Sequence, residues 1–401
     1  MSKVIVVGAG PAGIMAALSA SKKNEVILVD GNNEIGKKLK LTGGGRCNIT
    51  NNRNMERFLE KIVTNKKFLY SALYTFSNED LLLYFRNNNL EYKVEYDEKV
   101  YTKSDRAEEV IEVLKRDLMK NEVRTFYNTK VKDLIVDEGK IKGVITEAGE
   151  EILADKVIIA TGGKSHPTTG SDGSMYEILK RHGHTITDIY PALIPLVIKE
   201  GFIKNLQGVS MKEVVFSTKI KKKKIEITGD MIFTHFGLSG PGVLKFSSHI
   251  TKLLKDGEVI INLDFLKDIS REELSKVIRG SNKNIASNLK GYLPNNFIKE
   301  ILTLLDLTEI KAADLKKTDE LKLIEYIKEM RLTVTETITI KAAMVTSGGV
   351  KVKEINSSTM ESRIIKDLYF AGEVMDVDGE TGGFNLQIAF STGTLAGRLG
   401  E

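Results

Sequence analysis

The chain has 401 residues, about two to three times the length of a typical domain of roughly 150 residues, so we expect two or three domains. Hydrophobic residues make up 41% of it and charged residues 28%, which excludes a wholly disordered or collagen-like chain. The only cysteine, Cys47, excludes an internal disulfide, a Cys-x-x-Cys redox pair and a thiolate zinc cage.

The net charge of +5 is confined to one part of the chain. Residues 191–340 contain 24 Lys and Arg against 19 Asp and Glu, and the rest is balanced. Four consecutive lysines at 221–224 are interpreted as a solvated hairpin tip, with an anionic partner as the alternative. The apolar run at 4–7 is too short for a signal peptide or a membrane span, so we expect a cytoplasmic protein without membrane association.

The first 30 residues predict a strand, a glycine turn, a helix and a second strand. An apolar run at 3–7 precedes Gly8-x-Gly10-x-x-Gly13, a helix extends to about residue 21, and a strand at 25–29 is followed by Asp30. In such a βαβ unit the first glycine permits the tight turn, and the second lets the backbone approach a pyrophosphate. The third glycine allows the helix to pack closely on the strand, and the acid accepts hydrogen bonds from ribose hydroxyls. The pattern therefore predicts a dinucleotide site.

Two helices are expected at 79–90 and 105–120, then a small antiparallel meander after residue 123 and a central parallel strand at 156–160. Strand patterns follow around 196–199, 212–220, 223–228 and 258–263, and helical patterns at 271–290, 294–306 and 319–330. We therefore predict an FAD-binding domain at 1–190 and 341–401, interrupted by an inserted substrate-side domain at 191–340. Its β half covers about 191–265 and its helical half about 266–335. Strands at 332–340 and 367–372 and a helix of small residues at 385–399 complete the chain.

Four further segments favour FAD over NAD as the dinucleotide. The first is a triple-glycine loop at 42–48. The second and third, at 160–163 and 372–374, are glycine-containing segments at the ends of two apolar strands, and the fourth, at 382–387, leads into the last helix. Consecutive glycines carry a high conformational-entropy cost and are usually kept where the backbone must touch a ligand. Several glycine-lined strand ends that meet at one crevice suit a long cofactor.

These motifs resemble the bacterial aminoacetone oxidase family of FAD proteins, which also includes a bile-acid enoate reductase. The resemblance rests on the segments at 8–13, 37–38, 42–51, 160–163, 233–241, 372–379 and 382–387. It implies an α/β fold in which a glutathione-reductase-type Rossmann domain is interrupted by a β-barrel and a helical insert, with non-covalent FAD. The FAD contacts expected from the motifs and the resemblance together are Gly8, Gly10, Pro11, Ala12, Gly13, Asp30, Lys38, Thr42, Gly43, Gly44, Gly45, Arg46, Asn48, Val131, Ala160, Thr161, Gly162, Gly372, Glu373, Asn385 and Leu386. One departure is Tyr101-Thr-Lys103, where the family has Phe-Pro.

Residues for catalysis are harder to name, because a flavin supplies the redox chemistry itself. His235, in a loop rich in Gly, Ser and Pro, is our candidate for proton transfer, and His166 is a second candidate; a structural role is the alternative for both. Arg46 is expected to bind a cofactor phosphate or a substrate carboxylate. Cys47 is interpreted as a packed residue rather than a nucleophile, and His182 and His184 as surface residues, so no metal site is expected.

We therefore expect an FAD-dependent oxidoreductase acting on a small organic substrate. Two directions remain open, an amine-type oxidase that passes electrons to oxygen and a reductase supplied by NAD(P)H. Since no second GxGxxG occurs, any NAD(P)H would bind transiently at the flavin face. The alternative function is a flavin protein that binds RNA through its basic insert, although nucleic acid is the less favoured partner. The oligomeric state stays open.

Overall fold

The computed structural model describes residues 1–220 and 223–400. These residues form two compact units: unit 1 comprises Met1–Pro191 and Ile340–Glu401, and unit 2 comprises Ala192–Thr339. Lys221 and Lys222 of the lysine run lie outside the described residues.

A five-stranded parallel sheet is the centre of unit 1, in the order β20-β11-β1-β2-β7. The inner strands are short runs of buried Val, Ile and Leu, as expected for strands covered on both faces. The predicted strand at 156–160 is confirmed as an inner strand, because β11 pairs with both β1 and β20. The bounds are β1 (Lys3–Val7), β2 (Glu25–Val29), β7 (Arg124–Phe126), β11 (Lys156–Ile159) and β20 (Leu368–Phe370).

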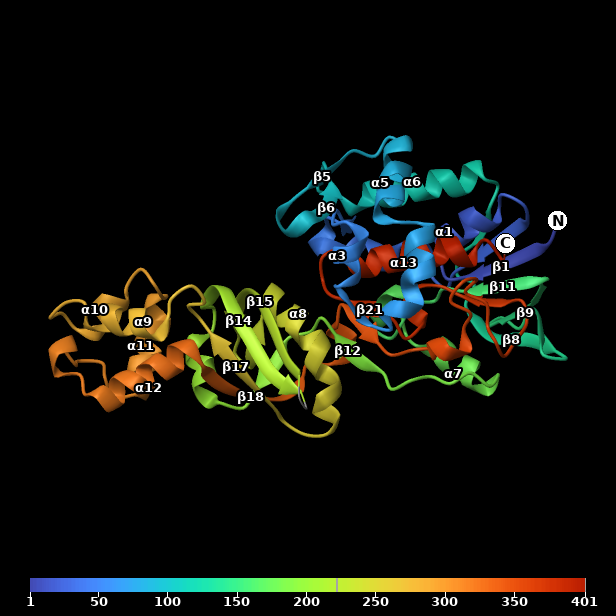
Figure 1. The fold of residues 1–401 in the computed structure, drawn as a ribbon. Helices are drawn as coiled ribbons and strands as arrows, with labels where there is room; N and C mark the ends of the chain where they lie inside the picture. The colour runs from blue at the N-terminus through green and yellow to red at the C-terminus, as the bar shows by residue number, and fades with distance from the viewer. Residues whose placement is uncertain (221–222, 401) are drawn as a thin grey trace. The chain divides into compact units, whose positions relative to one another are not determined.

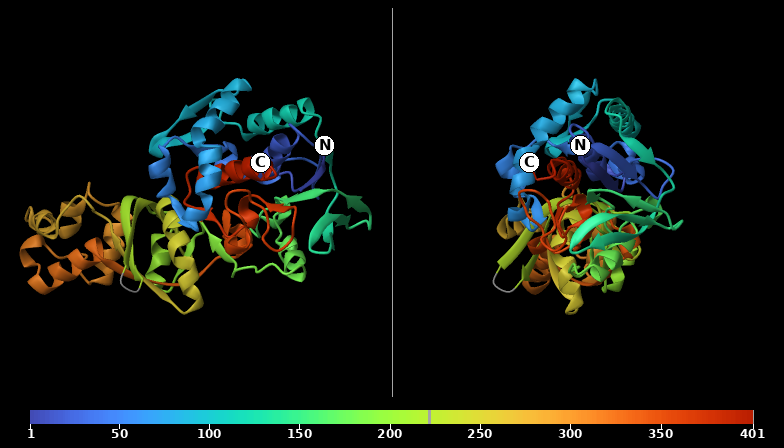
Figure 2. Two further views of the ribbon diagram at one scale, coloured as in Figure 1. Left: turned by 45° about the vertical axis from the view of Figure 1, so that its right-hand side comes forward. Right: turned by 90° about the vertical axis from the view of Figure 1, so that its right-hand side faces the viewer.

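Helices α1 (Pro11–Ala20) and α13 (Phe384–Ala396) pack closely in unit 1, and the views in Figures 1 and 2 show them side by side. A Cβ atom on Gly393 would lie 2.1 Å from the Ala12 carbonyl oxygen, and one on Gly397 would lie 2.3 Å from that of Ala16. Only glycine permits this approach, so these two glycines of the last helix pack against another helix, whereas the small residues of this segment indicated packing beside a cofactor or a sheet.

Smaller sheets and helices complete unit 1. The predicted meander is confirmed as an antiparallel sheet of β8 (Val131–Asp137), β9 (Lys140–Thr146) and β10 (Glu151–Leu153). A second sheet contains β3 (Asn48–Asn51), β6 (Lys99–Thr102) and β5 (Tyr92–Val94). The paired strands are β4 (Ile62–Thr64) with β21 (Asp378–Gly379), and β12 (Tyr190–Ala192) with β19 (Val345–Ser347). The remaining helices are α2 (Lys37–Leu41), α3 (Met55–Leu59), α4 (Tyr70–Thr75), α5 (Asn78–Asn87), α6 (Ala107–Lys120) and α7 (Ser174–Arg181).

Unit 2 is a closed six-stranded barrel with attached helices. The barrel order is β13-β16-β15-β14-β17-β18, and β13 pairs with β18 to close it. Figure 1 shows α8 on one side of the barrel and the group α9–α12 on the other. The bounds are β13 (Leu196–Ile198), β14 (Ser210–Ile220), β15 (Lys223–Phe233), β16 (Gly237–Ser239), β17 (Val259–Asp264), β18 (Met330–Thr337), α8 (Pro241–Ile250), α9 (Arg271–Arg279), α10 (Ile285–Leu289), α11 (Asn295–Leu304) and α12 (Lys317–Lys328).

One helix expected from the sequence is divided. The pattern at 271–290 forms α9 and α10, because α9 ends at Gly280 and the Asn284 side chain accepts the N–H of Ser287 to begin a new helix. Across the part of the chain that the structure describes, the helices lack the combination of length and apolarity that a membrane crossing requires.

Candidate functional site

The carboxyl ends of the parallel strands bring the predicted glycine turn and the strand end at 160–163 together. A Cβ atom on Gly8 would lie 2.5 Å from the Ala160 carbonyl oxygen, and one on Gly13 would lie 1.8 Å from that of Gly8. At Gly10 the same atom would meet no other described atom within 4 Å. Gly8 and Gly13 are therefore needed for packing, whereas the space beside Gly10 fits a pyrophosphate at the N-terminus of α1.

The Asp30 carboxylate already holds the turn. One of its oxygens accepts the Ala9 N–H at 2.6 Å, and the other accepts the backbone and side-chain N–H groups of Asn32 at 2.7 and 2.8 Å. The Asp30 carboxylate therefore connects the glycine turn at Ala9 to the segment that follows β2, and the predicted ribose contact would share it with these bonds. Asn32, for which the sequence offered no signal, is the polar residue bonded to the Asp30 carboxylate.

Next to Asp30 lies the segment that leads to Val131. The N–H of Thr129 donates to the Asp30 carbonyl oxygen at 2.8 Å, and a Cβ on Gly31 would lie 3.3 Å from Lys130 Cβ. Val131 follows at once as the first residue of β8 and is buried. This position fits the predicted backbone contact with an adenine.

The triple-glycine loop forms a short 3-10 helix, η1 (Thr42–Gly45), with left-handed backbone at Gly43 and Gly44, where φ is 60° and 68°. A Cβ on Gly44 or Gly45 would meet no other described atom within 4 Å, so these glycines do not serve packing. Glycine adopts left-handed backbone at little steric cost, and glycines with free space beside them fit a surface that a ligand covers. With its amide nitrogen facing β6, Asn48 donates to the Val100 carbonyl oxygen at 3.2 Å and accepts the Gly383 N–H at 3.0 Å.

Lys38 and Glu373 join distant segments of unit 1. The Lys38 ammonium donates to Glu373 at 2.7 Å and to the Ser165 hydroxyl at 2.7 Å. The other Glu373 oxygen accepts the Thr346 N–H at 2.7 Å and the Ser165 hydroxyl at 3.1 Å. Ser165 and Thr346 are buried, and the sequence offered no signal for either. This network fixes α2, the strand end after β11 and the turn after β20 relative to one another.

The strand end after β11 contains an unsatisfied polar atom. Thr161 Oγ1 is buried and has no hydrogen-bond partner among the described residues. Gly372, at the end of β20, donates its N–H to Thr392 Oγ1 of α13 at 2.9 Å, and a Cβ there would lie 2.8 Å from Ala12 Cβ. A buried hydroxyl without a partner carries a desolvation cost, which a hydrogen bond to a ligand would offset.

The N-terminus of α13 packs against β3. A Cβ on Gly383 would lie 2.3 Å from the Thr50 carbonyl oxygen. The Asn385 side chain accepts the Gly379 N–H at 2.9 Å and donates to the Gly379 and Glu380 carbonyl oxygens at 2.8 and 3.2 Å. The Asn385 side chain is therefore already used inside the chain. A cofactor contact at Asn385 or Leu386 would come from the backbone, because the N–H groups in the first turn of a helix have no acceptor within the helix.

Arg46 is held by carboxylates within unit 1. It donates to Asp105 at 2.7 Å and to Glu95 at 2.5 Å, and its guanidinium lies 4.1 Å from the centre of the Tyr101 ring. These partners raise the pKa of Arg46, and the pKa of Asp105 is lowered by Lys93 and Arg46. The phosphate or carboxylate role expected for Arg46 must compete with two acids already bound to it. We interpret Arg46 as a residue that positions the glycine loop.

The side chain of Cys47 is buried, and burial raises the pKa of its thiol to about 12. This favours the packed interpretation over a nucleophile. His182 contacts Asp133 at 2.9 Å and is partly buried. The prediction of a surface residue is wrong for His184, which is 3% exposed, bonded to the Ser362 hydroxyl at 2.8 Å and packed on Phe370.

The two histidines proposed for proton transfer lie in different units. His166 has left-handed backbone (φ 55°) and belongs to unit 1 beside the Lys38 network; burial and the Lys38 ammonium lower its pKa. His235 is exposed in unit 2, with its ring edge-on to Phe236 at 5.0 Å between ring centres. His166 is therefore the candidate that the described contacts connect to the predicted cofactor segments.

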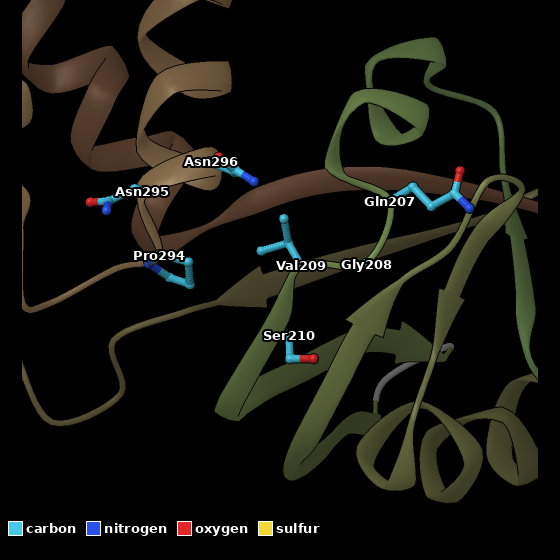
Figure 3. A pocket seen from close by; sticks show the side chains of 7 residues that line it. All are labelled: Gln207, Gly208, Val209, Ser210, Pro294, Asn295 and Asn296. Carbon is cyan, nitrogen blue, oxygen red and sulfur yellow. The ribbon is translucent and has the colours of Figure 1, made fainter.

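Unit 2 contains a shallow pocket of about 450 Å³ (Figure 3). The start of α11 contributes Pro294, Asn295 and Asn296 on one side, and the segment entering β14 contributes the other side. The lining from that segment is Gln207, Gly208, Val209 and Ser210. Amide and hydroxyl groups dominate, which suits a polar ligand.

Comparison with known proteins identifies the family to which the chain belongs. Residues 2–399 match the family described as HI0933-like protein Rossmann domain. The chain is 33% identical to a 3-dehydro-bile acid delta(4,6)-reductase of Clostridium scindens, with 99% of this chain and 98% of that protein covered. It is 29% identical to a ribosomal RNA dihydrouridine synthase of Escherichia coli, with 97% and 95% covered.

Solved structures agree on the fold alone. The 3-ketosteroid delta1-dehydrogenase of Sterolibacterium denitrificans matches with a TM-score of 0.53 at 12% identity, covering 99% of this chain and 98% of that one. The 3-ketosteroid-delta4-(5alpha)-dehydrogenase of Rhodococcus jostii matches with a TM-score of 0.51 at 13% identity, covering 99% and 95%. The predicted fold class, a Rossmann FAD-binding fold interrupted by a barrel, is confirmed.

Proposed function

The chain belongs to the HI0933-like Rossmann family of flavin-dependent oxidoreductases, and from this premise we propose that it reduces a carbon–carbon double bond conjugated to a carbonyl group. The observation that carries the proposal is the 33% identity to a named bile-acid reductase over 99% of the chain. The relatives named for dihydrouridine synthesis support it too, because dihydrouridine is uridine whose 5,6 double bond, conjugated to the C4 carbonyl, has been saturated.

The residues of unit 1 fit FAD. The open space beside Gly10, Gly44 and Gly45 and the orphaned Thr161 hydroxyl are features that a bound dinucleotide would explain. FAD, when bound, supplies hydride chemistry. The Lys38–Glu373 pair fixes the loops that hold the cofactor, and the N-terminus of α13 offers N–H groups to an anionic ring.

A double bond conjugated to a carbonyl also needs a proton at the carbon next to the carbonyl group. His166 and His235 are the proposed sources. The pKa of His166 is lowered from its ordinary value, so a protonated His166 would be a strong acid for its residue type and a minority form at neutral pH. We propose NAD(P)H as a transient reductant, because the sequence has no second dinucleotide motif.

Anaerobic flavin spectroscopy tests the direction of the reaction. NADH or NADPH should bleach the oxidised flavin, and a 3-oxo-Δ4 steroid or another conjugated enone should restore its colour. The product should contain two more hydrogens by mass spectrometry. If primary amines bleach the flavin and neither nicotinamide does, the chain is an amine-type oxidase and the reductase proposal fails.

A second candidate substrate is a uracil base in RNA. Two relatives named as ribosomal RNA dihydrouridine synthases support it, together with the basic surplus at 191–340. Unit 2 also places Tyr292, 46% exposed, beside exposed Lys290 and only two residues from the pocket residue Pro294. An exposed aromatic side chain near a lysine is a surface on which a nucleobase can stack.

RNA binding and turnover can be measured together on an unmodified ribosomal RNA transcript. Tyr292→Ala with Lys290→Gln should weaken salt-sensitive RNA binding and dihydrouridine formation by about tenfold, and leave enone reduction unchanged. Lys316→Gln, an exposed lysine in the same unit, is the matched control. Replacing the four lysines at 221–224 with glutamine should lower RNA retention without changing turnover of a small enone. No dihydrouridine above the enzyme-free level would remove the RNA candidate.

A further inference from the structure

Ser171 carries a buried hydroxyl that the described chain leaves unsatisfied. The residue is 4% exposed, and its Oγ has no hydrogen-bond partner among the described residues. A serine hydroxyl has one donor and two acceptor positions, and burying it without a partner costs free energy. Sequence analysis gave Ser171 no role.

The neighbours of Ser171 on the same segment are satisfied within the chain. Thr169 Oγ1 donates to the His166 carbonyl oxygen at 2.7 Å. The Asp172 carboxylate accepts the Ser174 N–H at 2.9 Å and the Lys130 ammonium at 3.0 Å, and so anchors the start of α7. The unsatisfied hydroxyl is therefore a property of Ser171 and not of a loosely packed loop.

The position of Ser171 connects it to the predicted adenosine side of the cofactor. A Cβ on Gly162, whose φ is 75°, would lie 2.9 Å from Ser171 Oγ, so the hydroxyl lies against the strand end that follows β11. The segment is also bonded to the residues that follow β2, because Asn32 Nδ2 donates to the Thr169 carbonyl oxygen at 3.0 Å. Asn32 in turn contacts Asp30. The segment 169–171 thus contacts the residues that follow β11 and β2, at the carboxyl edge of the sheet where ligands of open parallel sheets bind.

We propose that Ser171 Oγ is a binding group for the adenosine monophosphate half of FAD, with Asn32 holding its segment in place. This inference rests on FAD as the cofactor in the proposed function. The hydroxyl would donate to a phosphate or ribose oxygen, so its hydrogen bond forms only when the cofactor is present. Removing it should therefore affect cofactor binding and not folding, which is the reverse of what a structural serine would do.

The test compares Ser171→Ala with Thr169→Val, a control whose hydroxyl is already used inside the chain. Flavin release from the purified holoenzyme, followed by flavin fluorescence on dilution, should show FAD affinity lowered by about 5- to 50-fold in Ser171→Ala. The melting temperature of the flavin-stripped protein should stay the same or rise. Thr169→Val should lower that melting temperature and leave FAD affinity unchanged.

Titration of the stripped protein with ADP and with FMN locates the contact. Ser171→Ala should weaken ADP by the same factor as FAD and leave FMN unaffected. Equal FAD affinity in Ser171→Ala and wild type, as expected if a buried water satisfies the hydroxyl, would overturn the inference. So would a loss of affinity for FMN alone. A wild-type protein that takes up no FAD would instead end the proposed function itself.

Discussion

The ammonium group of Lys38 lies 2.7 Å from a carboxylate oxygen of Glu373, although the two residues are 335 positions apart in the chain. Both side chains are more than three-quarters buried, and the Ser165 hydroxyl contacts each of them. The pair holds α2, which leads into the triple-glycine loop, against the turn that follows β20. It therefore links the two halves of unit 1 at the predicted cofactor site.

Breaking this pair should loosen the cofactor. Lys38→Met removes the ammonium but keeps the length of the side chain, so Glu373 is left partly buried without its cation. We expect the free energy of unfolding to fall by about 1–2 kcal/mol. This is less than the cost for a fully buried pair, because solvent reaches part of both side chains and screens their charges. FAD release should also be faster. Thermal melts and flavin fluorescence measure the two effects. Lys40→Met, at an exposed pair with Glu108, should change neither.

Substitutions at Gly10 and Gly13 of the first turn should have different effects, one on cofactor binding and the other on folding. Gly10→Val places its Cβ where no other described atom lies within 4 Å, so the flavin-stripped variant should melt at the same temperature as the flavin-stripped wild type but should not retain FAD. Gly13→Ala puts a Cβ 1.8 Å from the Gly8 carbonyl oxygen and should destabilise the fold itself. Absorbance at flavin wavelengths and a melt of each variant give the comparison. Equal flavin content in wild type and Gly10→Val would show that no phosphate lies there.

The thiol of Cys47 should be inert in the native protein. Because burial raises its pKa to about 12, roughly one thiol in ten thousand is ionised at pH 8. A disulfide reagent should label the folded chain at least a hundredfold more slowly than the urea-unfolded chain. Cys47→Ser should retain turnover, and loss of turnover with FAD still bound would restore Cys47 as a reacting group.

Stability should decrease as the pH falls below about 6.5. Burial lowers the pKa of His184 in the folded chain, so the unfolded chain takes up its proton first as the pH falls through the ordinary histidine value. The slope from this group is at most about 1.4 kcal/mol per pH unit, down to the folded pKa. His184→Asn should flatten the change in melting temperature between pH 7.5 and 5.5. The exposed His235→Gln serves as the control.

His235 remains a prediction that kinetics can settle. Since its side chain is exposed, His235→Ala should leave both the melting temperature and FAD content unchanged. If it transfers the proton, the proton-coupled step of flavin oxidation should slow by roughly 10²–10⁴-fold in rapid mixing. An unchanged rate constant, with a slowed step in His166→Gln instead, would assign the proton to His166.

Local patterns were enough to predict the Rossmann elements. The glycine turn, the inner strand at 156–160 and the last helix each carry a signature that depends on neighbours within about ten residues. The Lys38–Glu373 pair, the buried Thr346 and the carboxylates that hold Arg46 carry no such signature, because their partners come from segments far apart in the chain. His184 was misassigned for the same reason. Its polar neighbours in sequence indicate a surface, while Ser362 and Phe370 bury it.

The insertion of unit 2 between the two segments of unit 1 also sets the order in which the site can be made. Lys38 and the glycine turn leave the ribosome early, but Glu373 and α13 follow more than 330 residues later, a delay of roughly 20–70 s at ordinary rates of synthesis. Until then the nascent chain has no β20 to pair with β11 and no last helix to cover α1. We therefore expect cofactor binding to begin only after β20 and α13 have been synthesised, and a product truncated before β20 should not retain flavin.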